Sequence, residues 1–70
     1  MMKILRLPHV IALTGLSRST LYLYMQKQQF PNQVKLGPRA IGWVEDEVVE
    51  WMRARIEIRN ADTKIKSLFY

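Results

Sequence analysis

The sequence predicts a mainly helical α+β domain, built from three helices and one small β-hairpin. Three stretches carry apolar residues at helical spacing, and each stretch starts or stops at a residue type typical of a helix boundary. Between the second and third stretches, two short apolar runs flank a Gly-Pro turn, which is typical of a hairpin. A chain of 70 residues forms one domain, and a hydrophobic fraction of 49% can supply its core.

The first segment combines a short strand with a short helix. Residues 3–7 alternate loosely between polar and apolar, so we expect a brief edge strand there. Pro8 suits the first turn of a helix, since its fixed φ is compatible with that turn and its missing N–H is not needed. We therefore predict a helix over 8–14. Gly15 is expected to cap it in the left-handed conformation, with Leu16 folding back as in a Schellman motif.

A second helix is predicted over 18–28. Ser17 is a suitable N-cap, because its hydroxyl can accept from the backbone N–H of Ser19 or Thr20. The helix should end before Phe30, since a residue that precedes proline avoids the helical region. One face is predicted to carry Leu21, Tyr24, Met25 and Gln28. The opposite face is predicted to carry Arg18, Ser19, Tyr22, Leu23, Gln26 and Lys27.

The hairpin and the third helix complete the predicted domain. Apolar runs at 34–36 and 40–44 flank Gly37-Pro38-Arg39, and the proline belongs in the turn because it cannot donate to a strand ladder. Three acids from Glu45 onward suit the positive end of a helix dipole, so the third helix is placed at 45–59 and is expected to stop at Asn60.

These boundaries divide the chain into a domain over 1–60 and a C-terminal tail over 61–70. The tail shows no clear period. Its apolar residues can dock on the domain or on another chain, and the sequence does not decide between the two. They are Ile65, Leu68, Phe69 and Tyr70.

Charge is distributed unevenly along the chain. Residues 1–39 hold 6 basic and no acidic residues, whereas the remainder holds 5 basic and 6 acidic residues, which gives +6 and −1 and a total of +5. The first part would attract a polyanion. No apolar run approaches the roughly 20 residues that span a bilayer, and the N-terminus lacks a signal-peptide pattern, so we expect a cytoplasmic protein without a membrane segment.

Two helices joined by a tight glycine-containing turn, the second basic at its start, are typical of a helix-turn-helix. In that arrangement the second helix enters the major groove of DNA. Arg18 can form two parallel hydrogen bonds to a guanine or a phosphate, and Ser19 and Thr20 are short hydroxyl donors. Tyr22 can reach a phosphate or touch a thymine methyl group. The alternative is an ordinary pair of helices with a surface arginine.

The hairpin beside this helix has the pattern of a DNA-contacting wing. Gly37 permits close approach of the backbone, and Lys35 and Arg39 suit the flanking backbone or a narrow minor groove. The alternative is a hairpin that only closes the core and carries its charges for solubility.

Nothing in the sequence indicates an enzyme, a cofactor or a metal site. His9 is the single histidine, and with no cysteine it cannot build a zinc site. Ser17 or Ser19 could pair with His9 as nucleophile and base, yet no third residue orients the histidine. The tryptophans and methionines have core spacing.

Residues 4–59 resemble the AlpA family of phage and genomic-island regulators, which are related to excisionases and to MerR-type winged helix-turn-helix domains. The resemblance rests on Leu5-Arg6-Leu7-Pro8, on Thr14-Gly15-Leu16-Ser17-Arg18-Ser19-Thr20-Leu21-Tyr22, on Phe30-Pro31, on Val34 to Trp43, and on Glu47-Val48 with Trp51. By position, Arg18, Ser19, Thr20 and Tyr22 match the recognition helix, Lys35, Gly37 and Arg39 match the wing, and Trp43 and Trp51 match aromatic core positions. The sequence departs from the family at Leu23, where a basic residue is frequent, and at Gln28, where a glycine often ends the helix.

The resemblance implies a winged helix-turn-helix that binds double-stranded DNA. Such a protein regulates prophage or island genes, or acts as an excisionase that assists an integrase, and several copies can associate on DNA. The alternative from a different class is a protein-interaction adaptor with a basic face. The predicted DNA-binding residues are Arg18, Ser19, Thr20, Tyr22, Leu23, Lys27, Lys35, Gly37 and Arg39.

Overall fold

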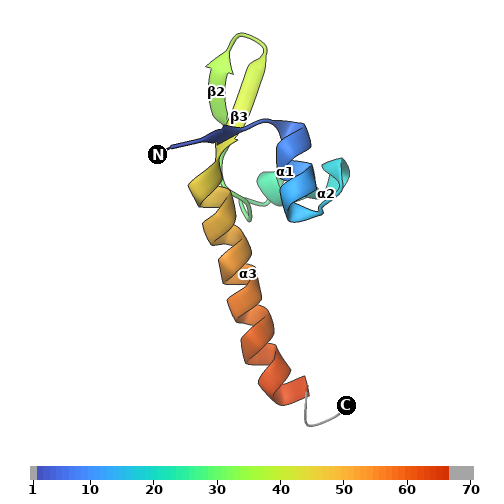
Figure 1. Cartoon of the computed structure of the whole chain (residues 1–70). Helices are drawn as coiled ribbons and strands as arrows, with labels where there is room; N and C mark the ends of the chain where they lie inside the picture. Colours follow the sequence, from blue (N-terminus) through green and yellow to red (C-terminus); the bar gives the residue numbers. More distant parts are fainter. Residues whose placement is uncertain (1, 67–70) are drawn as a thin grey trace.

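The computed structural model describes residues 2–66 and confirms the predicted fold class (Figure 1). Three helices and a three-stranded antiparallel sheet form a mainly helical winged helix-turn-helix. The hairpin projects from one end of the molecule and the long third helix from the other (Figure 1). In chain order the elements are β1 (Ile4–Leu5), α1 (Leu7–Thr14), α2 (Arg18–Gln26), β2 (Val34–Gly37), β3 (Ala40–Val44) and α3 (Glu45–Lys66).

The sheet has the strand order β1-β3-β2, so β3 is its central strand. The predicted edge strand is confirmed, because β1 pairs antiparallel with β3 through Ile4–Val44 and Leu5–Trp43. The backbone N–H of Glu45 also donates to the carbonyl oxygen of Lys3 at 2.8 Å, which joins the start of α3 to the N-terminal segment.

The hairpin β2–β3 contains a bulge at Leu36. Lys35 pairs with Ile41 and Gly37 pairs with Ala40, so one residue of β2 has no partner on β3. Pro38 lies in the two-residue turn with Arg39, as predicted. A bulge bends its strand and increases the local twist, so it re-aims the end of the hairpin.

Gly42 allows β1 to lie against β3, a role that the sequence did not reveal. A Cβ atom at this position would collide with Cγ2 of Ile4 and would lie 2.9 Å from the carbonyl oxygen of Leu5. The same added Cβ would lie 3.2 Å from Cδ1 of Leu36. Position 42 therefore requires glycine because no side chain fits there, and not because the backbone needs a conformation that only glycine adopts.

Helix α1 ends at Thr14 and is capped by Gly15, both as predicted, but the predicted Schellman motif is wrong. Gly15 has a φ of 74°, and its N–H donates to the carbonyl oxygen of Ile11 at 2.8 Å. The N–H of Leu16 donates instead to Oγ1 of Thr14 at 3.2 Å. The end is therefore the simpler left-handed motif with one backbone bond, because a threonine hydroxyl competes for the second donor.

Helix α2 ends at Gln26, two residues earlier than predicted. Gln28 takes a φ of 56°. Its N–H donates to the carbonyl oxygen of Met25 at 3.1 Å, and the N–H of Gln29 donates to that of Tyr24 at 2.8 Å. This is the bond pattern of a Schellman motif, in which glycine usually occupies the left-handed position. The chain thus adopts a glycine-type ending with a glutamine.

Helix α3 continues to Lys66, so the predicted end at 59 and the stop at Asn60 are wrong. Asparagine is only a weak helix breaker, at most about 0.7 kcal/mol worse than alanine, and neither glycine nor proline follows it. Oδ1 of Asn60 accepts from Nη2 of Arg59 at 3.0 Å and so is not used to cap the helix. Leu68, Phe69 and Tyr70 of the predicted tail lie outside the described residues, as does the side chain of Ile65.

One apolar core joins the three helices, β1 and β3. Its buried members are Leu5, Val10, Leu21, Phe30, Trp43 and Val48. Every element except β2 contributes one residue to this set, and the loop after α2 adds Phe30. Trp43 is fully buried, which confirms its predicted core position, and its indole N–H has no hydrogen-bond partner among the described residues.

Two negative findings apply to the described part of the chain. None of its helices combines the length and the apolar character that crossing a bilayer requires. Nor do the side chains that the structure describes, up to residue 61, bring together three or more His, Cys, Asp or Glu residues in a way that would hold a metal ion.

Candidate nucleic-acid interface

A three-residue turn, Gly15-Leu16-Ser17, sets the start of α2 against α1. Oγ of Ser17 accepts from the N–H of Thr20 at 3.1 Å, which confirms the predicted N-cap. The first turn of a helix has further N–H groups without a helical partner, and these and the positive end of the helix dipole favour an anion.

Six side chains on one side of α2 are exposed, as predicted. They are Arg18, Ser19, Tyr22, Leu23, Gln26 and Lys27. The other side packs on the core through the buried Leu21 and the half-buried Tyr24 and Met25. We call the exposed set the α2 arc. It contains two cations and no acid, and its apolar members Tyr22 and Leu23 are 42% and 45% exposed.

The two cations lie at opposite edges of the α2 arc. At about 100° per residue, Arg18 and Lys27 are separated by about 180° round the helix axis. The uncharged members lie between them, in the order Tyr22, Gln26, Ser19 and Leu23. The middle of the surface that α2 presents is therefore neutral, and its margins are positive.

Thr20 differs from the other predicted site residues of α2. It is only partly exposed, and its Oγ1 accepts from Oγ of Ser17 at 2.9 Å. Its backbone and its hydroxyl both take part in the cap. In this structure Thr20 stabilises the start of α2, and its contact with DNA stays a prediction.

The predicted wing residues lie on the projecting hairpin (Figure 1). Lys35 and Arg39 are exposed, the first on β2 and the second in the turn. Gly37 is not required by the protein itself, because an added Cβ would meet only Cβ of Ala40 at 4.0 Å. The structure therefore places the site residues in two groups, one on α2 and one on the hairpin.

None of Arg18, Lys27, Lys35 and Arg39 forms an ion pair with a described residue. Among the described residues, Lys3 pairs with Glu45 at 3.9 Å and Arg53 pairs with Glu50 at 3.6 Å, and both ion pairs involve α3. The cations of α2 and of the wing thus keep their charge available for an external anion.

The sequence did not reveal the contacts that join the end of α2 to α3. Nε1 of Trp51 donates to the carbonyl oxygen of Gln29 at 2.7 Å, and the Trp51 ring lies 4.8 Å from that of Phe30. The Arg55 guanidinium lies 5.5 Å from the Trp51 ring and 5.9 Å from the Tyr24 ring. These contacts fix the end of α2 against α3, and helical spacing alone indicated only that Trp51 faces the core.

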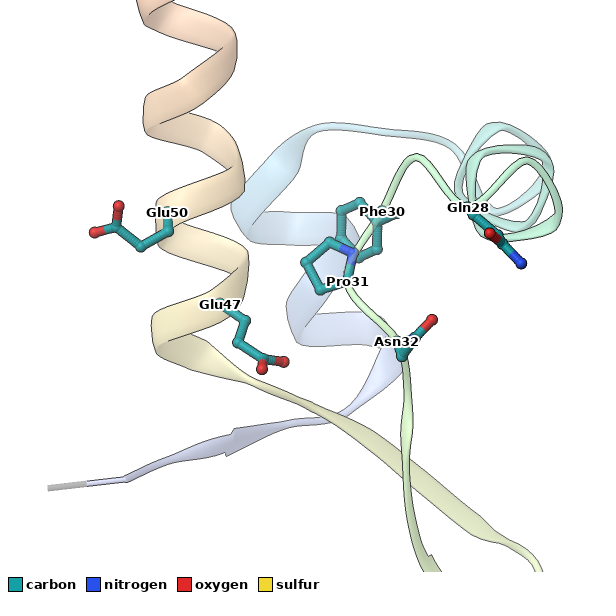
Figure 2. Close-up of a pocket in the computed structure, with 6 residues that line it drawn as sticks. All are labelled: Gln28, Phe30, Pro31, Asn32, Glu47 and Glu50. Atoms are coloured by element: carbon teal, nitrogen blue, oxygen red, sulfur yellow. The ribbon is translucent and has the colours of Figure 1, made fainter.

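A hollow beside the loop that follows α2 is lined in part by acidic side chains of α3. It has a volume of about 670 Å³ and is lined by Gln28, Phe30, Pro31, Asn32, Glu47 and Glu50. Figure 2 shows the Glu47 side chain reaching toward the Pro31–Asn32 segment, while that of Glu50 points away from it. Carboxylates at this position would repel a phosphate, so the hollow does not belong to a nucleic-acid interface.

The family model for the Prophage CP4-57 regulatory protein (AlpA) matches residues 3–56. The chain belongs to this family. The matched region contains β1, both helices of the helix-turn-helix, the hairpin and the first half of α3, which confirms the resemblance predicted from the sequence.

Two proteins are similar in sequence to this AlpA-family chain. It is 48% identical over 54 residues to the uncharacterized protein ORF88 of Enterobacteria phage P4, a match that covers 77% of this chain and 61% of the phage protein. It is 37% identical over 62 residues to the DNA-binding transcriptional activator AlpA of Escherichia coli K12, covering 80% of this chain and 89% of that protein. No solved structure matches it.

Proposed function

We propose that this AlpA-family protein is a sequence-specific regulator that binds double-stranded DNA, and not an enzyme. The observation that carries the proposal is the acid-free α2 arc, whose cations and those of the wing have no acidic partner among the described residues. The name of its E. coli relative, a DNA-binding transcriptional activator, supports the same function.

In the proposed complex, α2 enters the major groove and the β2–β3 hairpin follows the flanking backbone or minor groove. Arg18 and Lys27 at the edges of the α2 arc bind phosphates on the two sides of the groove. Ser19 and Tyr22 lie between them and face the base edges. Lys35 and Arg39 neutralise phosphates near the wing, and their long side chains allow for curvature of the duplex.

Binding to duplex DNA of random sequence tests the proposal against the adaptor alternative. The wild type should bind such DNA by fluorescence anisotropy, the single variants Arg18→Ala and Arg39→Ala should bind it more weakly, and the double variant Arg18→Ala/Arg39→Ala should bind it much more weakly. Arg53→Ala is the control for each of the two single variants, since it too removes one exposed arginine, here from α3, where its partner is Glu50. Equal loss in the control would mean that only net charge matters. No binding by the wild type would favour the adaptor.

The biological role divides into two candidates, and the E. coli relative's name favours transcriptional activation of prophage or island genes. The other candidate is an excisionase that binds beside an attachment site with an integrase. An in vitro excision assay with integrase, with and without this protein, separates them. Unchanged excision together with changed transcription from a bound promoter assigns the regulatory role.

We propose further that several copies bind side by side and that the protein acts in the bacterial cytoplasm, where its DNA is. One copy of so small a domain contacts few base pairs, so adjacent copies would raise the apparent affinity for DNA. A duplex with two sites should bind the second copy more tightly than the first. Independent binding to the two sites would exclude self-association on DNA.

A further inference from the structure

Leu23 is the one member of the α2 arc whose side chain has no polar atom, and the fold does not use it. It is 45% exposed and is not among the residues that pack on the core. It lies one helical turn after Ser19 and one turn before Lys27, on the surface that carries no acid. The leucine side chain at this position forms no hydrogen bonds with water, and it cannot bind a phosphate as a cation would.

The chemistry of the major groove limits what such a side chain can recognise. Base edges there present hydrogen-bond donors and acceptors, and the one apolar group among them is the 5-methyl group of thymine. Leucine has no polar atom, so any other base edge facing it would lose its hydrogen bonds to water without replacement.

The neighbours of Leu23 fit the same base pair. Gln26 lies three residues further on the α2 arc, and a glutamine amide can pair with N6 and N7 of adenine. Arg18, the one guanidinium of α2, lies at the edge of the arc and not in its middle, so a guanine is not the base that the centre of this surface favours.

We propose that Leu23 is a specificity-determining residue that selects an A·T pair through contact with the thymine methyl group. This inference rests on the proposed DNA binding by α2. In this proposal the cations at the two edges of the α2 arc bind the phosphate backbone of DNA, and the uncharged residues between them select the bases.

The test uses the full chain and a duplex selected from a random pool for tight binding. Each thymine of that duplex is replaced in turn by uracil, which lacks the methyl group but keeps every hydrogen-bonding atom. Binding of the wild type should weaken about three- to five-fold at one position, as expected for loss of one buried methyl contact.

The protein-side variant is Leu23→Ala, with Leu13→Ala on α1 as the control, since Leu13 is similarly exposed at 41%. Leu23→Ala should bind the thymine duplex several-fold more weakly and should no longer distinguish uracil from thymine at that position. Leu13→Ala should behave as the wild type.

Three results would overturn the inference while leaving DNA binding intact. They are no effect of uracil at any position, persistence of the uracil effect in Leu23→Ala, and failure of the pool to yield a preferred sequence although random duplexes bind. Failure to bind any duplex would instead reject the proposed function itself. Circular dichroism of Leu23→Ala confirms that the variant is folded before these results are compared.

Discussion

Gly42→Ala should destabilise the fold strongly, because β1 lies directly against this position. The added methyl group would collide with Cγ2 of Ile4 and would lie 2.9 Å from the carbonyl oxygen of Leu5, which is backbone. Overpacking of this kind costs about 1–3 kcal/mol. If β1 separates from β3 instead, the burial of Leu5 is lost, at about 1.5–3 kcal/mol. We therefore expect a decrease of about 2–3 kcal/mol in the free energy of unfolding.

Thermal and urea unfolding, followed by tryptophan fluorescence, measure this change. In a domain of this size each kcal/mol shifts Tm by about 4–8 °C, so Gly42→Ala should lower Tm by roughly 10–20 °C. Gly37→Ala is the matched control in the same hairpin, because its Cβ would meet only Ala40 at 4.0 Å. It should change stability by less than about 1 kcal/mol. Equal stability of Gly42→Ala and the wild type would refute the steric account of the sheet.

Two further predictions concern the ends of α2. Ser17→Ala should lower the free energy of unfolding by about 1 kcal/mol, since the bond from the N–H of Thr20 to Oγ of Ser17 is lost, whereas Ser19→Ala should change it by less than about 0.5 kcal/mol. Gln28→Gly should raise it by about 0.5–1 kcal/mol, because Gln28 has a φ of 56° that costs less for glycine. The same exchange at Gln26, the last residue of α2, should lower stability by up to about 1 kcal/mol. Urea unfolding measures all four, and a stabilising Gln26→Gly or a destabilising Gln28→Gly would contradict the assignment of the helix end.

The helix-turn-helix could be predicted because its boundaries are set by local chemistry. Pro8 begins one helix, Gly15 ends it and Ser17 caps the next, and each acts within a few residues of itself. The exposed face of α2 followed from the same spacing, because a helix that packs on a core must turn its polar side outward.

The parts that could not be predicted depend on contacts between distant residues. Gly42 looked like an ordinary strand residue, and only its pairing beside β1 shows why no side chain fits there. The contact from Trp51 to the carbonyl oxygen of Gln29 spans two elements and leaves no local pattern. The helix end predicted at Asn60 is wrong because the weak preference of asparagine against a helix does not stop one.

The salt dependence of duplex binding tests most directly the claim that α2 and the wing form a DNA interface. If about five cations, Arg18, Lys27, Lys35 and Arg39 among them, neutralise phosphates, log K should fall with log salt at a slope of roughly −4 to −5. Arg18→Ala should make that slope less steep by about 0.9, and Arg53→Ala should leave it unchanged. A slope near zero for the wild type, or equal slopes for Arg18→Ala and the wild type, would contradict the proposed interface.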